Sequence, residues 1–320
     1  MPRTVIVVPC FNEAARLDGR RFVDAVDRDP RVEFLFVDDG SRDATLPRLQ
    51  FLAAERPGRI GWLHLEKNSG KAEAVRRGVC AAFRGRPEHV GYWDADLATP
   101  LDEIPRFRAV LDRRPDVRLV IGTRLPLLGR TLVRKRSRRL LGRLFARAAS
   151  WTIGLPIFDT QCGAKLFRAD AETERLFAEP FLSKWIFDVE LFARLATGRI
   201  SASVRRVGSS RLEARATGQG NAADAVYELP LENWRDVAGS KLRGRDFLRA
   251  IGELAIIRWR YFGLGSKGRQ GTVRDESAAR EGWTSSPRIL GRRGPIPTDH
   301  HAAIDTRHGE TRWSEERQAA

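Results

Sequence analysis

Two carboxylates set one residue apart, Asp94 and Asp96, are the residues whose types and spacing best suit chemistry in this chain. They follow the apolar run Val90–Trp93, so they stand where a buried strand would end. Two carboxylates in such a place are costly unless a positive partner lies between them. We expect that partner to be Mg²⁺ or Mn²⁺ carrying a diphosphate, because both hard cations take carboxylate and phosphate oxygens. Asp-x-Asp is also common in surface turns, so the neighbouring motifs decide its meaning.

Three earlier segments place polar side chains where an apolar run ends. Pro9–Glu13 follows one run, Asp38 and Asp39 follow the next, and Lys71 comes after Asn68–Gly70. The first loop could face a nucleotide, and Lys71 could meet a phosphate or a base, although its spacing is not that of a P-loop. The structural alternatives are an ordinary turn for the two aspartates and a helix-dipole contact for Glu13 in a first helical turn.

Short apolar runs alternate with helical patterns over the first 125 residues, in the manner of a buried parallel sheet with crossover helices. The expected strands are Val5–Val8, Phe34–Val37, Ile60–Leu65, Val90–Trp93 and Leu119–Ile121, and the expected helices are Ala14–Val26, Asp43–Ala54, Lys71–Phe83 and Asp102–Leu111. This order predicts an α/β fold with a Rossmann-like, doubly wound, mostly parallel sheet and flanking helices. Ligands of such sheets bind at the carboxyl ends of the strands, where the motifs above all fall.

Charge and composition restrict the class of protein. The 320 residues are 42% hydrophobic and 31% charged, with a formal net charge of +16, which suits one large globular domain or two small ones. No acidic residue lies between Asp116 and Asp159, a gap that holds ten Arg or Lys. This basic segment implies an anionic partner, namely phosphates, nucleic acid or an anionic membrane.

Cysteine usage and hydropathy point to a cytoplasmic protein without a membrane span. Three scattered cysteines form neither a metal-spaced cluster nor a disulfide framework. No stretch approaches the roughly 18 apolar residues that a spanning helix needs. The segment Arg130–Ile153 nevertheless has an apolar helical face beside an arginine stripe, which is typical either of a helix lying in a membrane interface or of an ordinary packed surface helix.

The same patterns divide the chain into three parts. Residues 1–240 form one expected domain, with the strand-end motifs over 1–125 and the basic helix in 126–240. A second amphipathic stretch over 241–262, centred on Phe247–Trp259, forms a C-terminal helical extension. Residues 263–320 are rich in Gly, Pro, Ser and charge, and we expect a disordered tail.

The motifs occur in a familiar order. Pro9–Glu13, Val37–Ser41, Asn68–Lys71 and Asp94–Asp96 resemble the family 2 inverting glycosyltransferases, which have the GT-A fold. The later segments narrow the resemblance to dolichyl-phosphate β-glucosyltransferases and other polyprenyl-phosphate glycosyltransferases. These segments are Gly122–Arg124, Arg136–Ser137, Asp159–Phe167, Lys184–Leu191 and Trp234–Leu242. The resemblance covers roughly Thr4 to Tyr261.

The resemblance implies a role for particular side chains. The catalytic residues would be Asp188 and Asp96, and Asp94 with Asp96 would hold the metal, Mg²⁺ or Mn²⁺. The nucleotide-sugar site would comprise Pro9, Asn12, Glu13, Val37, Asp39, Lys71, Asp94, Ala95 and Asp96. The phosphate and acceptor site would comprise Arg124, Arg136, Arg139, Gln161, Lys165 and Lys241.

The implied reaction is the metal-dependent, inverting transfer of glucose from UDP-glucose to a polyprenyl or dolichyl phosphate. Its partners would be the nucleotide sugar, the lipid phosphate and the cytoplasmic surface of a membrane, where the protein would be peripheral. Asp188 would orient the acceptor or take its proton, or it would only place a charge at a helix N-terminus.

Other functions stay open at this point. A GDP-mannose-dependent polyprenyl-phosphate mannosyltransferase, or a family 2 transferase with another acceptor, would carry the same motifs. A basic nucleic-acid-binding protein with a Rossmann-like core is a remote alternative that the charge alone permits. Paired carboxylates at strand ends would repel nucleic acid, and the aromatic residues are not interleaved with the basic segment. A non-catalytic relative is disfavoured because Asp39, Asp94, Asp96 and Asp188 are all present.

Overall fold

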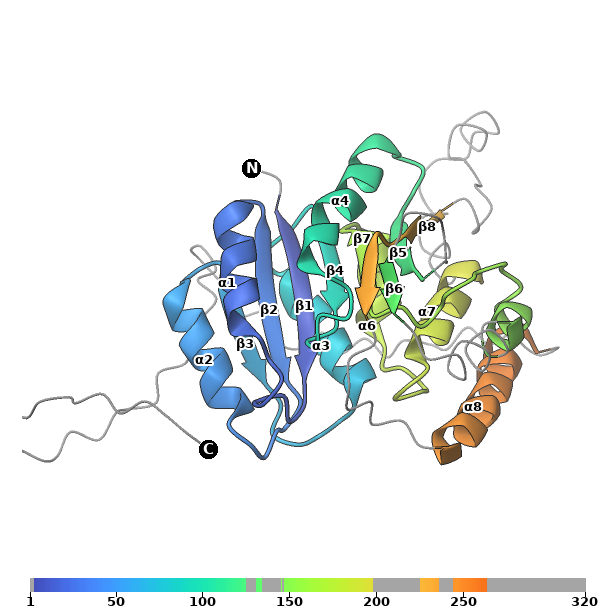
Figure 1. Ribbon diagram of the computed structural model, residues 1–320. Helices are drawn as coiled ribbons and strands as arrows, with labels where there is room; N and C mark the ends of the chain where they lie inside the picture. The colour runs from blue at the N-terminus through green and yellow to red at the C-terminus, as the bar shows by residue number, and fades with distance from the viewer. Residues whose placement is uncertain are drawn as a thin grey trace, which may run out of the picture. The chain divides into compact units, whose positions relative to one another are not determined.

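A seven-stranded sheet organises the molecule in this computed structural model, which describes residues 3–124, 131–133, 145, 147–197, 225–235 and 244–263. The strand order is β3-β2-β1-β4-β7-β5-β8 (Figure 1). The strands are β1 (Thr4–Cys10), β2 (Val32–Asp38), β3 (Ile60–His64), β4 (His89–Trp93), β5 (Leu119–Thr123), β7 (Ala164–Arg168) and β8 (Val226–Pro230). All neighbouring pairs are parallel except those made by β7, which runs antiparallel between β4 and β5.

Helices cover both faces of this sheet, as a doubly wound fold requires. They are α1 (Gly19–Arg28), α2 (Thr45–Glu55), α3 (Lys71–Phe83), α4 (Ile104–Arg113) after the 3₁₀ turn η1 (Leu101–Glu103), α6 (Ala171–Ala178), α7 (Phe187–Ala196) and α8 (Gly244–Phe262). One apolar core joins α3, α6, α7 and α8 to one face, and a second joins α1, α2 and α4 to the other. Along β1, Val5 and Val7 enter the first core, whereas Ile6 and Val8 enter the second. The near-continuous apolar runs are therefore strands buried on both faces.

The close packing of α3 on the sheet depends on a glycine. A Cβ atom at Gly78 would lie 2.3 Å from Val7 Cγ1 and 2.8 Å from Val37 Cγ2. The absence of a side chain lets the helix approach β1 and β2, and this approach fixes where the N-terminus of α3 lies at the carboxyl edge of the sheet.

All five expected strands and the helix Lys71–Phe83 are confirmed, but the first helix is shorter than predicted. It begins at Gly19 instead of Ala14, because the preceding residues form a turn in which Arg16 N and Leu17 N both donate to Glu13 O. Leu17 is buried because the turn packs on the core. Its apolar side chain therefore matched the helical pattern without belonging to the helix. The prediction that Glu13 lies in a first helical turn was therefore wrong.

The later part of the chain completes the same sheet. Strands β7 and β8 flank β5, so segments far apart in the sequence lie side by side. A separate parallel pair joins β6 (Thr131–Val133) and β9 (Asn233–Arg235). Helical residues 147–153 represent the described end of the predicted basic segment, and α8 extends the predicted amphipathic stretch at both ends.

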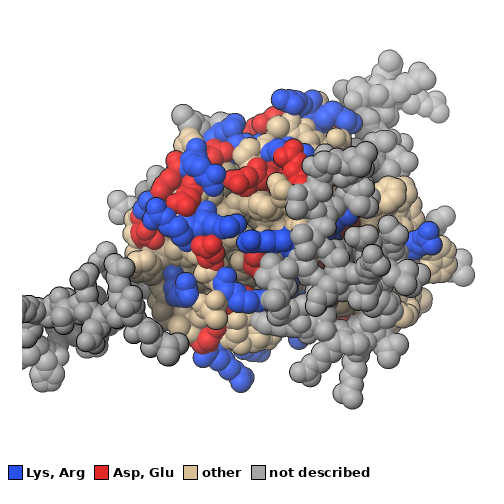
Figure 2. Space-filling view, in the orientation of Figure 1, with Lys and Arg blue, Asp and Glu red and all other residues tan. Residues whose placement is uncertain are grey.

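Part of the predicted basic segment lies outside the described residues, together with Arg136, Arg139, Lys241 and the tail after Gly263. On the face drawn in Figure 2, basic and acidic side chains alternate among the described residues. Arg56 and Asp27, for example, form a partly exposed ion pair at 2.7 Å. In the described part of the chain, no helix combines the length and apolar character that crossing a membrane requires.

Candidate active site

The carboxylate pair lies in a tight turn at the carboxyl end of β4. Asp94 N donates to Gly163 O at 3.1 Å, and Asp96 Oδ1 accepts from Ala98 N at 3.1 Å. Ala95 and Leu97 are buried and anchor the turn, and Leu97 adopts a left-handed φ of 53°. Both aspartates are left half-buried, with their carboxylates at the edge of the sheet where the sequence predicted them.

Gly163 stands directly against this carboxylate pair. A Cβ atom at Gly163 would lie 1.8 Å from Asp94 Oδ2, a distance that no real contact allows. A side chain there would displace the Asp94 carboxylate, so a glycine is needed for Asp94 to keep its position.

Lys71 supplies a positive charge to the pair from the N-terminus of α3. Its Nζ lies 2.5 Å from Asp94 Oδ1. Burial acts to lower the pKa of Lys71, but the carboxylates of Asp94 and Asp188 outweigh it, and the pKa is raised. A cation at a helix N-terminus opposes the helix dipole, so these carboxylates stabilise a lysine that the helix itself does not favour.

Asp188 is buried in the first turn of α7 and is held by two partners. Lys165 Nζ on β7 lies 2.7 Å from Asp188 Oδ1, and the hydroxyl of Tyr92 on β4 donates to the same oxygen. Lys165 also donates to Thr160 O at 3.1 Å and Cys162 O at 2.8 Å. An isolated buried charge is very costly, so Lys165 and Tyr92 are what allow Asp188 to remain inside the protein.

The site fits a divalent cation by its donor set. Asp94 and Asp96 offer carboxylate oxygens at one strand end, the ligand type that Mg²⁺ and Mn²⁺ prefer. Burial and the neighbouring charge of Asp94 raise the pKa of Asp96. Lys71 neutralises only one of the two carboxylates, and its ammonium group marks a place that favours positive charge.

The predicted nucleotide-side residues lie on loops that bind one another. Asp39, buried after β2, accepts from Ser69 N at 2.7 Å and Gly70 N at 2.8 Å. Its own N–H donates to Cys10 O at 2.8 Å, so Asp39 joins the ends of β1 and β2 to the loop before α3. Burial raises the pKa of Asp39 against these two hydrogen bonds. Each carboxylate oxygen keeps a second acceptor site in this arrangement.

The loop after β1 is equally well braced. Asn12, at a left-handed φ of 52°, donates its N–H to Ser41 Oγ and accepts from Arg42 N, both at 2.9 Å. The Glu13 carboxylate pairs with Arg16 at 2.5 Å. Pro9 and Val37 are register partners on β1 and β2, and the Val37 side chain is completely buried in the core. Val37 is therefore enclosed in the core and has no accessible surface at the edge of the sheet.

The predicted phosphate-side residues have more varied surroundings. Arg124 forms a two-pronged pair with Asp159, at 2.5 Å and 2.6 Å, and its guanidinium lies 5.2 Å from the Trp234 ring centroid. Gln161 is half-buried, and its Nε2 has no hydrogen-bond partner among the described residues. Lys165, expected at the acceptor phosphate, is instead fully buried against Asp188. Its structural role is to position that carboxylate.

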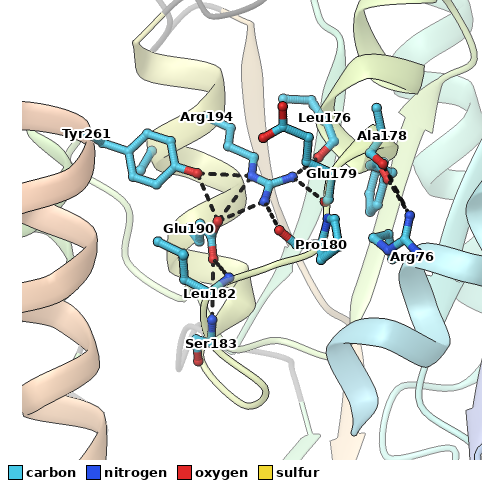
Figure 3. Close-up of polar contacts among 12 residues, drawn as sticks. Arg76, Leu176, Ala178, Glu179, Pro180, Leu182, Ser183, Glu190, Arg194 and Tyr261 are labelled. Atoms are coloured by element: carbon cyan, nitrogen blue, oxygen red, sulfur yellow. Dashed lines mark hydrogen bonds and ion pairs between the residues drawn. The ribbon is translucent and has the colours of Figure 1, made fainter. Parts of the chain in front are cut away.

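A buried network that the motifs did not predict lies on α7, the helix whose first turn carries Asp188 (Figure 3). Glu190 Oε1 accepts from Arg194 Nη2 and Tyr261 Oη, both at 2.8 Å, and its Oε2 accepts from Leu182 N at 2.7 Å. Arg194 donates further to the carbonyl oxygens of Leu176, Glu179 and Pro180. The sequence does show a Glu and an Arg four residues apart, a spacing that allows an ion pair on one helix. It does not show that this pair is buried.

This network joins α8 to the segment that leads into α7. Ser183 Oγ hydrogen-bonds Glu253 on α8, and Ile186 N donates to Ser183 Oγ at 2.8 Å. In the same segment, Lys184 O accepts from Ala72 N at 3.4 Å. The segment 182–186 therefore contacts both helices whose N-terminal turns carry site residues, α3 with Lys71 and α7 with Asp188.

Comparison with known proteins identifies the family. The model of the family described as "Glycosyl transferase family 2" matches residues 5–174, a range that includes every motif at the ends of β1, β2 and β4. This chain belongs to glycosyl transferase family 2. It is therefore a glycosyltransferase.

Curated relatives agree with this assignment. The chain is 31% identical to a dolichyl-phosphate β-glucosyltransferase of Dictyostelium discoideum, over 58% of this chain and 60% of the relative. It is 30% identical to the human dolichyl-phosphate β-glucosyltransferase, over 65% of this chain and 68% of the relative. The chain thus spans 60–68% of the length of these two proteins.

A solved structure supports the fold. Glucosyl-3-phosphoglycerate synthase from Mycobacterium tuberculosis, in complex with Mn²⁺, UDP-glucose and phosphoglyceric acid, superposes with a TM-score of 0.53. The superposition covers 81% of this chain and 79% of the other at 18% sequence identity. The expected GT-A architecture, a mostly parallel sheet with helices on both faces, is confirmed.

Proposed function

We propose that the protein transfers a hexose, with inversion, from a nucleotide diphosphate sugar to the phosphate of a polyprenyl lipid, and that the donor is UDP-glucose. The observation that carries the proposal is one site that unites Asp94, Asp96, Lys71 and the buried Asp188 from three elements and their turns. Similarity to two dolichyl-phosphate β-glucosyltransferases supports a polyprenyl phosphate as the acceptor and glucose as the sugar.

On the donor side, Asp94 and Asp96 would hold Mg²⁺ or Mn²⁺ at the diphosphate. The bound metal would neutralise charge on the departing UDP, which then needs no proton. Lys71, already turned toward Asp94, would add a second positive group at the phosphates. The loops fixed by Asp39, Asn12 and Glu13 would bind the uridine, with Asp39 accepting from the base.

On the acceptor side, a phosphate monoester is its own nucleophile. Its second pKa is about 6, so it is largely a dianion at neutral pH. An acceptor oxygen would form the new bond to the anomeric carbon, attacking from the face opposite UDP. The bond between the anomeric carbon and the UDP oxygen would break, and its electron pair would stay on that oxygen. No strong base is required. Asp188, fixed by Lys165 and Tyr92, would orient the sugar or the acceptor.

Arginines would bind the lipid phosphate, since the planar guanidinium suits its oxygens. Arg124 would do so once a phosphate competes with Asp159. The half-buried Gln161 offers an amide nitrogen that has no hydrogen-bond partner in the described part of the chain. Arg136, Arg139 and Lys241 remain candidates from the sequence. Because the acceptor is a lipid, the enzyme would work as a peripheral protein at the surface of a membrane.

The test is turnover of UDP-glucose against GDP-mannose with a short-chain polyprenyl phosphate, with and without Mg²⁺ or Mn²⁺. We expect UDP release that requires both metal and acceptor, and its loss in Asp96→Ala. GDP release from GDP-mannose would instead identify a mannosyltransferase. Turnover of neither donor with this acceptor would refute the proposal.

A separate variant tests the acceptor-side carboxylate. Asp188→Asn keeps the shape of the side chain but removes its charge, so we expect kcat to fall while donor binding is retained. An unchanged kcat would remove Asp188 from the mechanism without affecting the assignment of the metal-binding pair.

A further inference from the structure

Helix α8 is apolar on two opposite sides, although it packs on only one of them. Its packed side enters the core shared with α7 through Ala250, Leu254, Ile257 and Tyr261. The side facing away carries Ile251, Gly252, Ala255, Ile256 and Trp259, all exposed. Trp259 has 78% of its surface accessible. A helix that is apolar all round is normally enclosed, so the outward stripe calls for a partner.

A second tryptophan extends this stripe beyond α8. Trp151, at the described end of the basic segment, is 71% exposed. Arg258 on α8 joins the two helices, because it donates to Trp151 O and Thr152 O at 3.0 Å and its guanidinium lies 4.3 Å from the Trp151 ring centroid. The outward stripe and Trp151 therefore form one surface, which we name the apolar edge.

Charge borders the apolar edge on both sides. With 100° between successive residues of a helix, Arg258 lies at one margin of the stripe and Arg260 at the other. A tryptophan-bearing apolar stripe with basic margins is the pattern of a helix lying in the interface of a bilayer. Tryptophan favours the headgroup level, the aliphatic side chains enter the acyl boundary, and arginine reaches anionic headgroups.

We infer that the apolar edge is the surface by which this protein lies on a lipid bilayer. The inference rests on the proposed function in one respect, since a lipid acceptor gives the enzyme a reason to meet a bilayer.

The inward side of α8 connects this surface to the candidate active site. Glu253 and Tyr261 bind Ser183 and Glu190, and the segment 182–186 contacts the N-terminus of α3. A bilayer bound to α8 would thereby lie at a fixed position relative to the site.

The experiment is co-sedimentation of the full chain with vesicles of phosphatidylcholine and phosphatidylglycerol. The variant is the double substitution Trp259→Ser and Ile256→Ser. The control is Phe51→Ser on α2, whose exposure of 68% lies between those of Ile256 (53%) and Trp259 (78%). We expect the double variant to bind vesicles roughly tenfold more weakly for each side chain removed, because each loses its burial in lipid. The control should bind as the unaltered protein does, and all three should unfold at the same temperature, since the replaced side chains are exposed.

Two activity measurements separate this inference from the proposed function. With a short-chain polyprenyl phosphate in solution, the double variant should turn over donor as the unaltered protein does, whereas with the acceptor in vesicles it should be slower. If the unaltered protein turned over donor with neither acceptor, the proposed function would be refuted, and the vesicle-binding result would still stand.

Two results would overturn the inference. One is vesicle binding by the double variant equal to that of the control. The other is a change from dimer to monomer in the double variant with vesicle binding unaltered, which would show that a second copy of the chain covers the apolar edge.

Discussion

Removal of the positive charge behind Asp188 tests the core of the site. Lys165 is fully buried, and its Nζ lies 2.7 Å from Asp188 Oδ1. Lys165→Met keeps the length of the side chain but leaves a buried carboxylate without its counter-charge. Breaking a buried pair in this way costs about 3–5 kcal/mol of stability, a large share of the roughly 5–15 kcal/mol that a folded protein has. Turnover should fall at least about a hundredfold, because small displacements of a site carboxylate have effects of that size.

A second substitution distinguishes positioning from a purely structural role. In Lys165→Met combined with Asp188→Asn, no buried charge is left unpaired, so part of the lost stability should return. Turnover should not return, because the carboxylate itself is gone. Tyr92→Phe is the milder companion. It removes one hydrogen bond to a charged group, worth about 1.5–3 kcal/mol.

Urea unfolding followed by tryptophan fluorescence measures the stabilities, and release of the nucleoside diphosphate measures turnover. The reasoning is refuted if Lys165→Met is as stable and as active as the unaltered protein. It is also refuted if the two substitutions destabilise additively, since additivity would mean that the two side chains do not interact.

Three further substitutions have defined outcomes. Gly163→Ala should reduce turnover more than tenfold at nearly unchanged melting temperature, because its Cβ displaces the Asp94 carboxylate. Tyr261→Phe, which removes a hydroxyl that donates to Glu190, should lower the urea-unfolding free energy by about 1.5–3 kcal/mol and reduce kcat more than KM. Burial lowers the pKa of His89 to about 4, and the charged groups around it are Asp112, Arg168, Arg108 and Arg31. The folded state therefore keeps His89 neutral, while the unfolded state gains a proton below about pH 6.5. His89 should thus contribute a fall of about 3 kcal/mol in unfolding free energy between pH 7 and pH 4, a contribution that His89→Leu should lack.

The sheet was predictable because its strands are buried on both faces, which leaves near-continuous apolar runs in the sequence. The start of the helix at Lys71 was predicted to the residue. Gly70 directly precedes it and adopts a left-handed φ of 95°, a conformation that favours glycine. The antiparallel strand β7 was not predicted. Its residues include Lys165 and Arg168, and a strand with two basic residues carries no clear apolar pattern.

The strand-end position of Asp94 and Asp96 was predictable from the sequence, whereas the buried environment of Lys165 was not. Asp94 and Asp96 end a strand, a local feature that the sequence displays directly. The environment of Lys165 depends on contacts with Tyr92 and Asp188, which lie far from it in the sequence and meet only when β7 enters the sheet. A lysine in a list of motifs is read as a surface group that binds phosphate. Only the fold reveals that this one is inside the protein.

The charges of the assembled site give a physical reason for the divalent cation that we propose at Asp94 and Asp96. Lys165 is committed to Asp188, and Lys71 to Asp94. Asp96 has no ammonium partner of its own among the described contacts, so three carboxylates face two lysines. A nucleotide diphosphate approaching this site would meet an excess of negative charge at the turn that must receive it. One divalent cation bound by Asp94 and Asp96 would reverse the sign of that turn. Asp188, already paired with Lys165, would keep its charge balance and could still orient the acceptor as proposed.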